Sequence, residues 1–186
     1  MTDWLDGDRK SKMKLNEVYF WTDTIKDWSH LLADDAYKLL IINQLKSQVE
    51  KGQIKVFGYV IMPNHIHLLW QMIKLNGKEM PHASFNKATA HEIINDLKSG
   101  YPDKLSGFRV DEKERKFRVW LRDPLAVLMD SKEKFVQKLD YIHDNPLVEK
   151  WSFVKYPEDY KWSSSRFYLT GEDEFGFLTH YSEYFE

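Results

Sequence analysis

Two strongly apolar runs, residues 54–62 and 65–72, follow each other with only Pro63 and Asn64 between them. Both runs are rich in aromatic and β-branched residues and have the length of a buried strand. A Pro-Asn pair breaks or bends a strand ladder, because proline has no backbone N–H to donate, so it marks a tight turn or a bulge. The chain is therefore expected to contain a buried pair of strands around which its other elements are arranged.

The other elements alternate between strand and helix patterns. Asp34 is placed to cap a helix, Gly52 and Gly100 to end helices, and Pro146 to stop the last one. Beyond the two apolar strands, the predicted elements are a strand at residues 17–24, a helix at 34–49, a helix at 84–99, a strand within 108–121 and a helix at 132–145. The order predicts an α+β, ferredoxin-like (split βαβ) fold, an antiparallel sheet with helices on one face, plus a C-terminal helix and an irregular tail.

The chain of 186 residues shows no internal repeat and no low-complexity linker, which predicts a single domain over residues 1–186. Its core is expected at about residues 15–146, with an aromatic-rich extension at 147–186. No apolar run has the length of a membrane span, and the first ten residues lack the apolar centre of a signal peptide. We therefore expect no membrane partner and a cytoplasmic location.

The charge distribution leaves a nucleic-acid partner open. The net charge of −2 argues weakly against one, but residues 170–186 carry five acidic groups and no Lys or Arg, and without them the charge becomes +3. Residues 98–122 hold eight basic and four acidic side chains. Such a strip can bind DNA, although charge alone favours a solvated face.

His65 and His67 are two residues apart in a predicted strand, so they project to the same face. Two imidazoles in this arrangement can bind one divalent ion if a third protein ligand joins them, and the absence of cysteine leaves His, Asp, Glu, Asn or Gln for that role. A His-x-His pair by itself is more often hydrogen-bonded on a polar sheet face. Here it interrupts the most hydrophobic stretch of the chain, where polar groups are costly, which favours a metal site.

Tyr141 lies off the apolar stripe of the predicted helix at residues 132–145 and shares its side of the helix with Lys138 and Asn145. Asn145, four residues after Tyr141, can complete the metal site begun by the two histidines. A phenol with a pKa near 10 is a poor nucleophile without a neighbouring cation, a base or an electrophilic phosphate, and Lys138 is placed to help. His143 falls nearly opposite Tyr141 and is expected to pack or cap beside Val136. Without the two histidines, Tyr141 would be interpreted as a half-buried surface tyrosine.

Three segments resemble the REP-associated tyrosine transposases, domesticated relatives of the small single-tyrosine insertion-sequence transposases. They are YVIMPNHIHLL at residues 59–69, LDYIHDNP at 139–146 and PEDYKWSSSRFY at 157–168. The resemblance runs over residues 18–181. It implies a ferredoxin-like sheet with the tyrosine on a helix beyond it, His65 and His67 as the HUH metal ligands, Tyr141 as the nucleophile and Asn145 as an amide third ligand. Glu149, often a glycine in the family, is a departure.

The function that the resemblance implies is transposition of single-stranded DNA. A metal-dependent enzyme, using Mg²⁺ or Mn²⁺ and no nucleotide cofactor, would cleave and rejoin DNA through a covalent 5′-phosphotyrosine at hairpin-containing repeats, and would associate with the nucleoid when bound to DNA. The basic side chains expected to contact the DNA backbone are Arg115, Lys116, Arg118 and Arg122.

Two other functions fit the same residues. A metal-dependent phosphodiesterase would use the two histidines and an activated water, with Tyr141 only structural. A non-catalytic nucleic-acid-binding module would use the sheet alone, and would be expected to carry aromatic platforms in place of the histidines and to bind without metal. The sequence leaves open whether the active unit is a monomer or a homodimer, which hairpin is bound and which metal is preferred.

Overall fold

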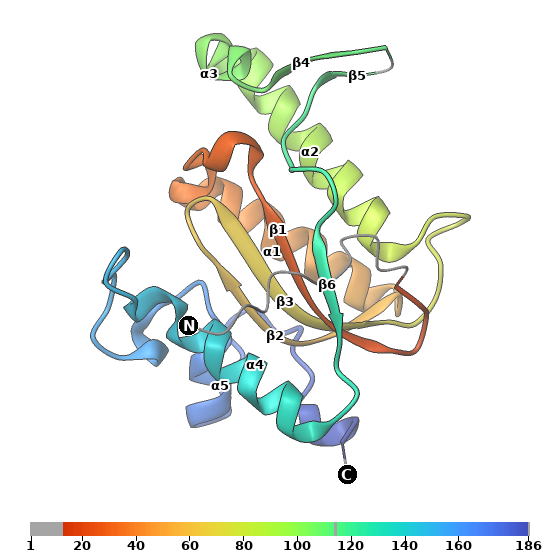
Figure 1. Cartoon of the computed structure of the whole chain (residues 1–186), viewed down its shortest axis with the longest axis vertical. Helices are drawn as coiled ribbons and strands as arrows, with labels where there is room; N and C mark the ends of the chain where they lie inside the picture. The colour runs from red at the N-terminus through yellow and green to blue at the C-terminus, as the bar shows by residue number, and fades with distance from the viewer. Residues whose placement is uncertain (1–12, 114, 186) are drawn as a thin grey trace.

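The computed structural model describes residues 13–113 and 115–185, so the prediction about the first ten residues lies outside it. Four strands form an antiparallel sheet in the order β2-β3-β1-β6 (Figure 1). Their bounds are Val18–Thr24 for β1, Ile54–Ile61 for β2, His65–Met72 for β3 and Leu125–Leu128 for β6. This is the strand order of the split βαβ arrangement, with the first and third strands at the centre. The predicted ferredoxin-like α+β fold is confirmed.

The sheet is covered on both faces. Helices α1 (Asp35–Glu50) and α2 (Pro81–Gly100) pack on one face, and α4 (Lys132–Asp144) packs on the other (Figure 1). Strand alternation produces this division, because Ile66, Leu68 and Trp70 belong to the core under α1 and α2, whereas Leu69 belongs to the core under α4. The residues that alternate with them on β3 are His65 and His67, which therefore lie on the α4 face.

The strand predicted within residues 108–121 is not the fourth strand of the sheet, so that prediction was wrong. Those residues form a separate two-stranded hairpin, β4 (Arg109–Glu112) and β5 (Arg115–Phe117), which lies with α3 (Pro102–Ser106) beyond the end of the sheet (Figure 1). Val119 and Trp120 are both buried, which ends the alternation that suggested one strand. The true fourth strand, β6, has only four residues, and so short a run gives little periodic signal.

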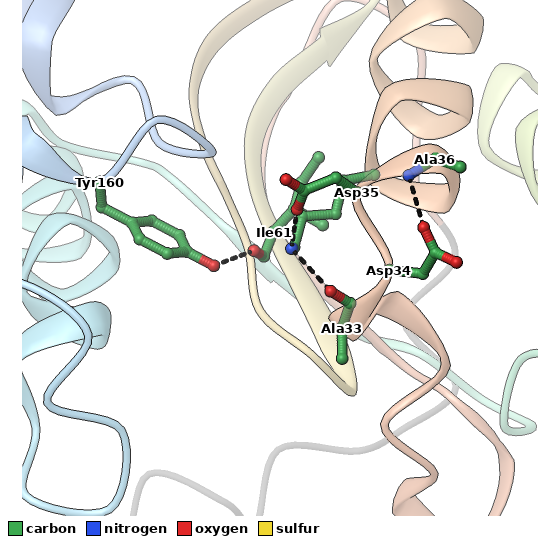
Figure 2. A network of polar contacts seen from close by, with 7 residues as sticks. Ala33, Asp34, Asp35, Ala36, Ile61 and Tyr160 are labelled. Carbon is green, nitrogen blue, oxygen red and sulfur yellow. Dashed lines mark hydrogen bonds and ion pairs between the residues drawn. The ribbon is translucent and has the colours of Figure 1, made fainter.

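Helix α2 is longer than predicted because Pro81 occupies its first turn, where a proline costs no hydrogen bond, and Gly100 is its last residue. Helix α1 begins as predicted, with the Asp34 carboxylate accepting from the Ala36 N–H at 2.9 Å (Figure 2). Among the helices that the structure describes, none is long and apolar enough to cross a membrane.

The tail after α4 packs along the free edge of β2 and is mostly irregular, as predicted, although it contains a short helix. Its elements are the 3₁₀ turns η3 (Asn145–Leu147), η4 (Pro157–Asp159) and η5 (Tyr181–Glu183) and the helix α5 (Ser165–Thr170). Figure 2 shows the Tyr160 hydroxyl donating to the Ile61 carbonyl, at 2.9 Å. The Ile61 N–H donates to the Trp162 carbonyl, also at 2.9 Å. The tail thus satisfies backbone groups that would otherwise form an open sheet edge.

Candidate functional site

His65 and His67 lie side by side at the start of β3, with ring centroids 4.7 Å apart. Pairing with β1 places Thr22 opposite His67 and Thr24 opposite His65. His67 is buried and His65 is partly exposed, so the pair lies at the edge of the α4 face, where one side is open to solvent. The two imidazoles are close enough to share one ion.

Each imidazole uses its Nδ1 atom for a contact within the protein. Nδ1 of His65 lies 2.7 Å from Oδ1 of Asn64, and Nδ1 of His67 lies 2.6 Å from Oγ1 of Thr22. The Asn64 amide nitrogen donates to the Trp28 carbonyl at 3.4 Å, which fixes the amide so that its oxygen faces His65. Nδ1 of His65 must therefore be the donor, which leaves the lone pair on Nε2. Metal-binding histidines commonly have such a partner on the second nitrogen.

Burial keeps both rings uncharged at neutral pH. Burial lowers the pKa of His65 to about 4, while its contact with the Asn145 side chain acts in the opposite direction. Burial also holds the pKa of His67 well below its usual range, and the nearby His65 and Lys138 lower it further. Only a neutral imidazole has a nitrogen lone pair to offer, so both side chains are in the form that a metal ion binds.

Helix α4 reaches the histidines because Gly58 lets it approach β2 closely. A Cβ atom at Gly58 would lie 2.7 Å from Cδ1 of Leu139 and 3.1 Å from Cδ1 of Ile142, closer than side chains normally pack. The ladder between β2 and β3 also shifts register between Val56 and Gly58. The missing side chain and the irregularity together set the distance between helix and sheet.

Tyr141 lies on α4 directly beside His67, with ring centroids 5.4 Å apart in an edge-on arrangement. It also meets the ring of Phe20 edge-on at 6.0 Å. The side chain is 49% exposed, so its phenol is accessible rather than buried in the core. The ammonium of Lys138 lies 5.3 Å from the centre of the Tyr141 ring and 4.9 Å from that of Phe20. Burial lowers the pKa of Lys138, with a further contribution from Lys134.

Asn145 continues the spiral of α4, with φ −51° and ψ −42°, although the helix ends one residue earlier. Its amide nitrogen donates to the Tyr141 carbonyl at 3.3 Å, and its side chain contacts His65. The structure therefore brings His65, His67, Asn145, Tyr141 and Lys138 together at one place. Within the described ranges, no three His, Asp or Glu side chains gather as a metal site, so an amide is the available third protein ligand. The donor set of two neutral imidazoles and one amide fits a divalent ion.

His143 serves the fold, on the side of α4 away from Tyr141. Its Nε2 lies 2.8 Å from Oγ of Ser164, and its ring centroid lies 5.6 Å from that of Tyr168. These partners are in the tail, whereas the sequence led us to expect His143 to pack or cap beside Val136. The same Ser164 hydroxyl accepts from the Tyr59 N–H at 3.0 Å. Sequence reasoning did not find this link, although both residues lie in the segments that carry the family resemblance.

The four basic residues predicted to contact DNA lie on β5 or in the segment that follows it. Arg115 and Lys116 are exposed on β5, at the opposite end of the molecule from α4 (Figure 1). Arg118 is mostly buried and forms a salt bridge with Glu112, and Arg122 reaches the same carboxylate at 3.1 Å. Arg115, Lys116 and Arg122 are thus exposed to solvent, whereas Arg118 is held against Glu112 at the base of the hairpin.

No family model matches this chain, and no curated protein matches it. Several solved structures do match. One is a REP-associated tyrosine transposase bound to a REP hairpin, which is 15% identical in sequence, with 93% of this chain and 92% of that chain covered and a TM-score of 0.60. Because nearly all of both chains is superimposed, this chain shares the whole fold of that protein. The family resemblance inferred from the three motifs is confirmed at the level of the fold.

Proposed function

We propose that this protein is a single-tyrosine HUH transposase, which cleaves single-stranded DNA and rejoins it through a covalent phosphotyrosine. The observation that carries the proposal is the placement of an exposed tyrosine on a helix, 5.4 Å between ring centroids from one of two paired histidines. The shared fold with a hairpin-bound REP-associated tyrosine transposase supports a hairpin in single-stranded DNA as the substrate.

Divalent metal, Mg²⁺ or Mn²⁺, would be held by Nε2 of His65, Nε2 of His67 and the side-chain oxygen of Asn145. When bound, the ion offsets negative charge on the non-bridging oxygens of the scissile phosphate. Thr22 and Asn64 orient the imidazoles through Nδ1, and burial keeps both rings neutral. The Asn145 amide nitrogen donates to the Tyr141 carbonyl, so the amide oxygen is the atom that would bind the metal.

The Tyr141 oxygen forms a bond to phosphorus as the bond from phosphorus to the 3′ oxygen breaks. The phenol loses its proton, and the departing oxygen takes one up as a free 3′-hydroxyl. The Lys138 ammonium lies beside the Tyr141 ring and supplies a positive charge next to the nucleophile. Since the new phosphodiester keeps the energy of the old one, a 3′-hydroxyl can reverse the step and join another strand. No nucleotide cofactor is required.

The test is formation of a covalent adduct on hairpin-containing single-stranded DNA of randomised sequence, labelled at either end, with Mn²⁺ or Mg²⁺. A 5′-phosphotyrosine carries the 3′-labelled fragment with the protein on a denaturing gel, whereas the 5′-labelled fragment is released. Tyr141→Phe is expected to abolish the adduct, and chelation of the metal is expected to do the same. Tyr156→Phe, at a tyrosine that is 51% exposed in the tail, is the matched control and should retain it.

Other outcomes separate the two alternative functions. Cleavage that continues in Tyr141→Phe without an adduct would show a phosphodiesterase that uses water. Binding without metal and without cleavage by the unaltered protein would show a non-catalytic nucleic-acid module. Either result would overturn the proposed chemistry while leaving the fold unchanged.

A further inference from the structure

Aromatic side chains from two loops form a rim beside His65. The aromatic rim consists of the ring contacts made by His30, Trp151 and Phe153, together with Trp28, which lies two residues before His30. The ring of Trp151 lies 6.4 Å from His65, 5.6 Å from His30 and 5.5 Å from Phe153, measured between centroids. The rim thus begins at a candidate metal ligand and runs outward from it.

The rim is open to solvent even though its residues are aromatic. Trp28 is 59% exposed and Phe153 is 45% exposed. Single exposed aromatic rings are common in proteins, but the rings of His30, Trp151 and Phe153 gather in one place, and a contiguous exposed apolar patch marks a binding surface. The Lys150 ammonium lies 4.8 Å from the centre of the Trp151 ring, so the surface combines aromatic faces, which suit bases, with a cation that suits the DNA backbone.

The backbone that carries the rim is held in an unusual conformation. Asp27, Trp28 and Ser152 have φ values of 56°, 55° and 44°, in the left-handed region that only glycine adopts readily. They are three of the five such non-glycine residues in the described part of the chain. Strain of this kind persists where the surrounding structure imposes it, and it clusters at sites that bind or react. Here the left-handed backbone leaves the Trp28 side chain exposed, and at Ser152 it brings the rings of Trp151 and Phe153 close together.

The rim is also tied to the histidine pair. The Trp28 carbonyl accepts from the Asn64 amide, and the oxygen of that amide accepts from Nδ1 of His65. A change in the position of Trp28 would therefore be transmitted to the orientation of a candidate metal ligand. This link makes the rim part of the same site, at its entrance.

The geometry points to the aromatic rim as a platform on which unpaired bases next to the scissile phosphate stack. This inference rests on the proposed function, because it takes the DNA backbone to pass the histidine pair. Aromatic stacking holds single-stranded DNA whatever its sequence, since every base has a flat face, and it excludes duplex DNA, whose bases are already stacked. The rim would therefore favour an unpaired strand over a paired one at the site of cleavage.

The test is binding of three fluorescent probes by the full chain, measured by anisotropy in EDTA: a dT 12-mer, an abasic 12-mer of equal charge and a 12-base-pair duplex. The unaltered protein should bind the dT 12-mer on the order of ten-fold more tightly than the other two. The double variant Trp28→Ala, Phe153→Ala should lose that preference by weakening dT binding alone. Tyr101→Ala, at a ring that is 47% exposed beside α3, is the matched control and should behave as the unaltered protein does.

Both replaced rim side chains are exposed, so the double variant should melt near the temperature of the unaltered protein, which circular dichroism checks. Equal binding of dT and abasic probes by the unaltered protein, tight binding of the duplex, or full dT affinity in the double variant would each overturn the inference. Full dT affinity in the double variant would also be the result if the rim bound another protein and not DNA. Because EDTA removes metal chemistry, the binding measured here does not depend on cleavage, so failure of the adduct test and failure of the rim are distinguishable.

Discussion

The hydroxyl oxygen of Thr22 lies 2.6 Å from Nδ1 of His67, although the two residues are 45 positions apart in sequence. The contact exists because β1 and β3 are antiparallel neighbours that place the two residues directly opposite each other. A strand at the centre of the sheet thereby orients a candidate metal ligand on the next strand.

Replacing Thr22 with Val should weaken Mn²⁺ binding by roughly 10- to 100-fold, because the His67 ring loses the partner that fixes it. Isothermal titration calorimetry measures this directly. Thr22→Ser keeps the hydroxyl and should bind the metal as the unaltered protein does. Unchanged affinity in Thr22→Val would show that the contact does not orient a ligand.

Gly58→Ala should destabilise the fold by about 1–3 kcal/mol, because the new methyl group would lie 2.7 Å from Cδ1 of Leu139. The clash is relieved by moving α4 outward, which carries Tyr141 away from His67, so adduct formation should slow even where the protein remains folded. Urea unfolding and adduct rate are the two measurements. Gly100→Ala meets no atom within 4 Å, so it should leave the adduct rate unchanged and should not lower stability.

His143→Ala and Ser164→Ala should each destabilise the protein by about 1–3 kcal/mol, because the first removes a buried ring and its hydrogen bond and the second removes the partner of both His143 and the Tyr59 N–H. A double-mutant cycle in urea should give a coupling energy of about 0.5–1.5 kcal/mol between the two side chains. Additive losses would show that the contact contributes nothing. Adduct formation at low temperature should survive in both variants, because this contact lies on the opposite side of α4 from Tyr141.

Burial also lowers the pKa of His143 to about 4, so the unfolded chain binds a proton there before the folded protein does as the pH falls. Its contribution to stability is therefore present above the ordinary histidine pKa of about 6.5 and is lost as the pH falls toward 4. The stability difference between the unaltered protein and His143→Gln should shrink over that interval. Unfolding curves recorded in EDTA at several pH values measure it, and a constant difference would contradict the expected burial.

Asp23 should change the stability of the fold with pH in the opposite direction to His143. It lies under α2, where burial raises its pKa from 3.8 to about 7 against the hydrogen bonds from the Asn86 side chain and the Thr24 N–H. The folded protein thus holds a proton that the unfolded chain releases, so stability is greatest below about pH 4 and falls as the pH rises through 7. Asp23→Asn should remove this loss and gain up to about 4 kcal/mol over the unaltered protein between pH 4 and pH 8. A gain that does not depend on pH would contradict the shift.

Arg115 and Lys116, exposed on β5, should contribute to DNA binding through charge alone. Replacing each with Ala should reduce the slope of log affinity against log salt concentration by about one, without changing sequence preference. Arg118→Ala should instead lower stability, because its side chain is buried against Glu112. An unchanged salt slope in both Arg115→Ala and Lys116→Ala would place the DNA elsewhere.

Much of the fold was predictable because local patterns were strong. The apolar strands on either side of Pro63 and the helix before Pro146 lie within one or two residues of their predicted ends. The fourth strand was missed because four residues of β6 carry too little periodicity, while an alternating segment at 108–121 mimicked a strand and became a hairpin with part of its chain buried. Strand pairing is set by distant partners, which a local pattern does not contain.

The sequence by itself determined which side chains share a face: strand alternation put His65 with His67, and helix periodicity put Tyr141 with Lys138 and Asn145. Only the tertiary structure decided that these two faces meet, because their distance depends on how closely α4 packs over Gly58. It likewise decided that Thr22 and Asn64 hold the imidazoles, and that rings from two distant loops gather beside them. Periodicity acts along one element, whereas the site arises from packing between elements.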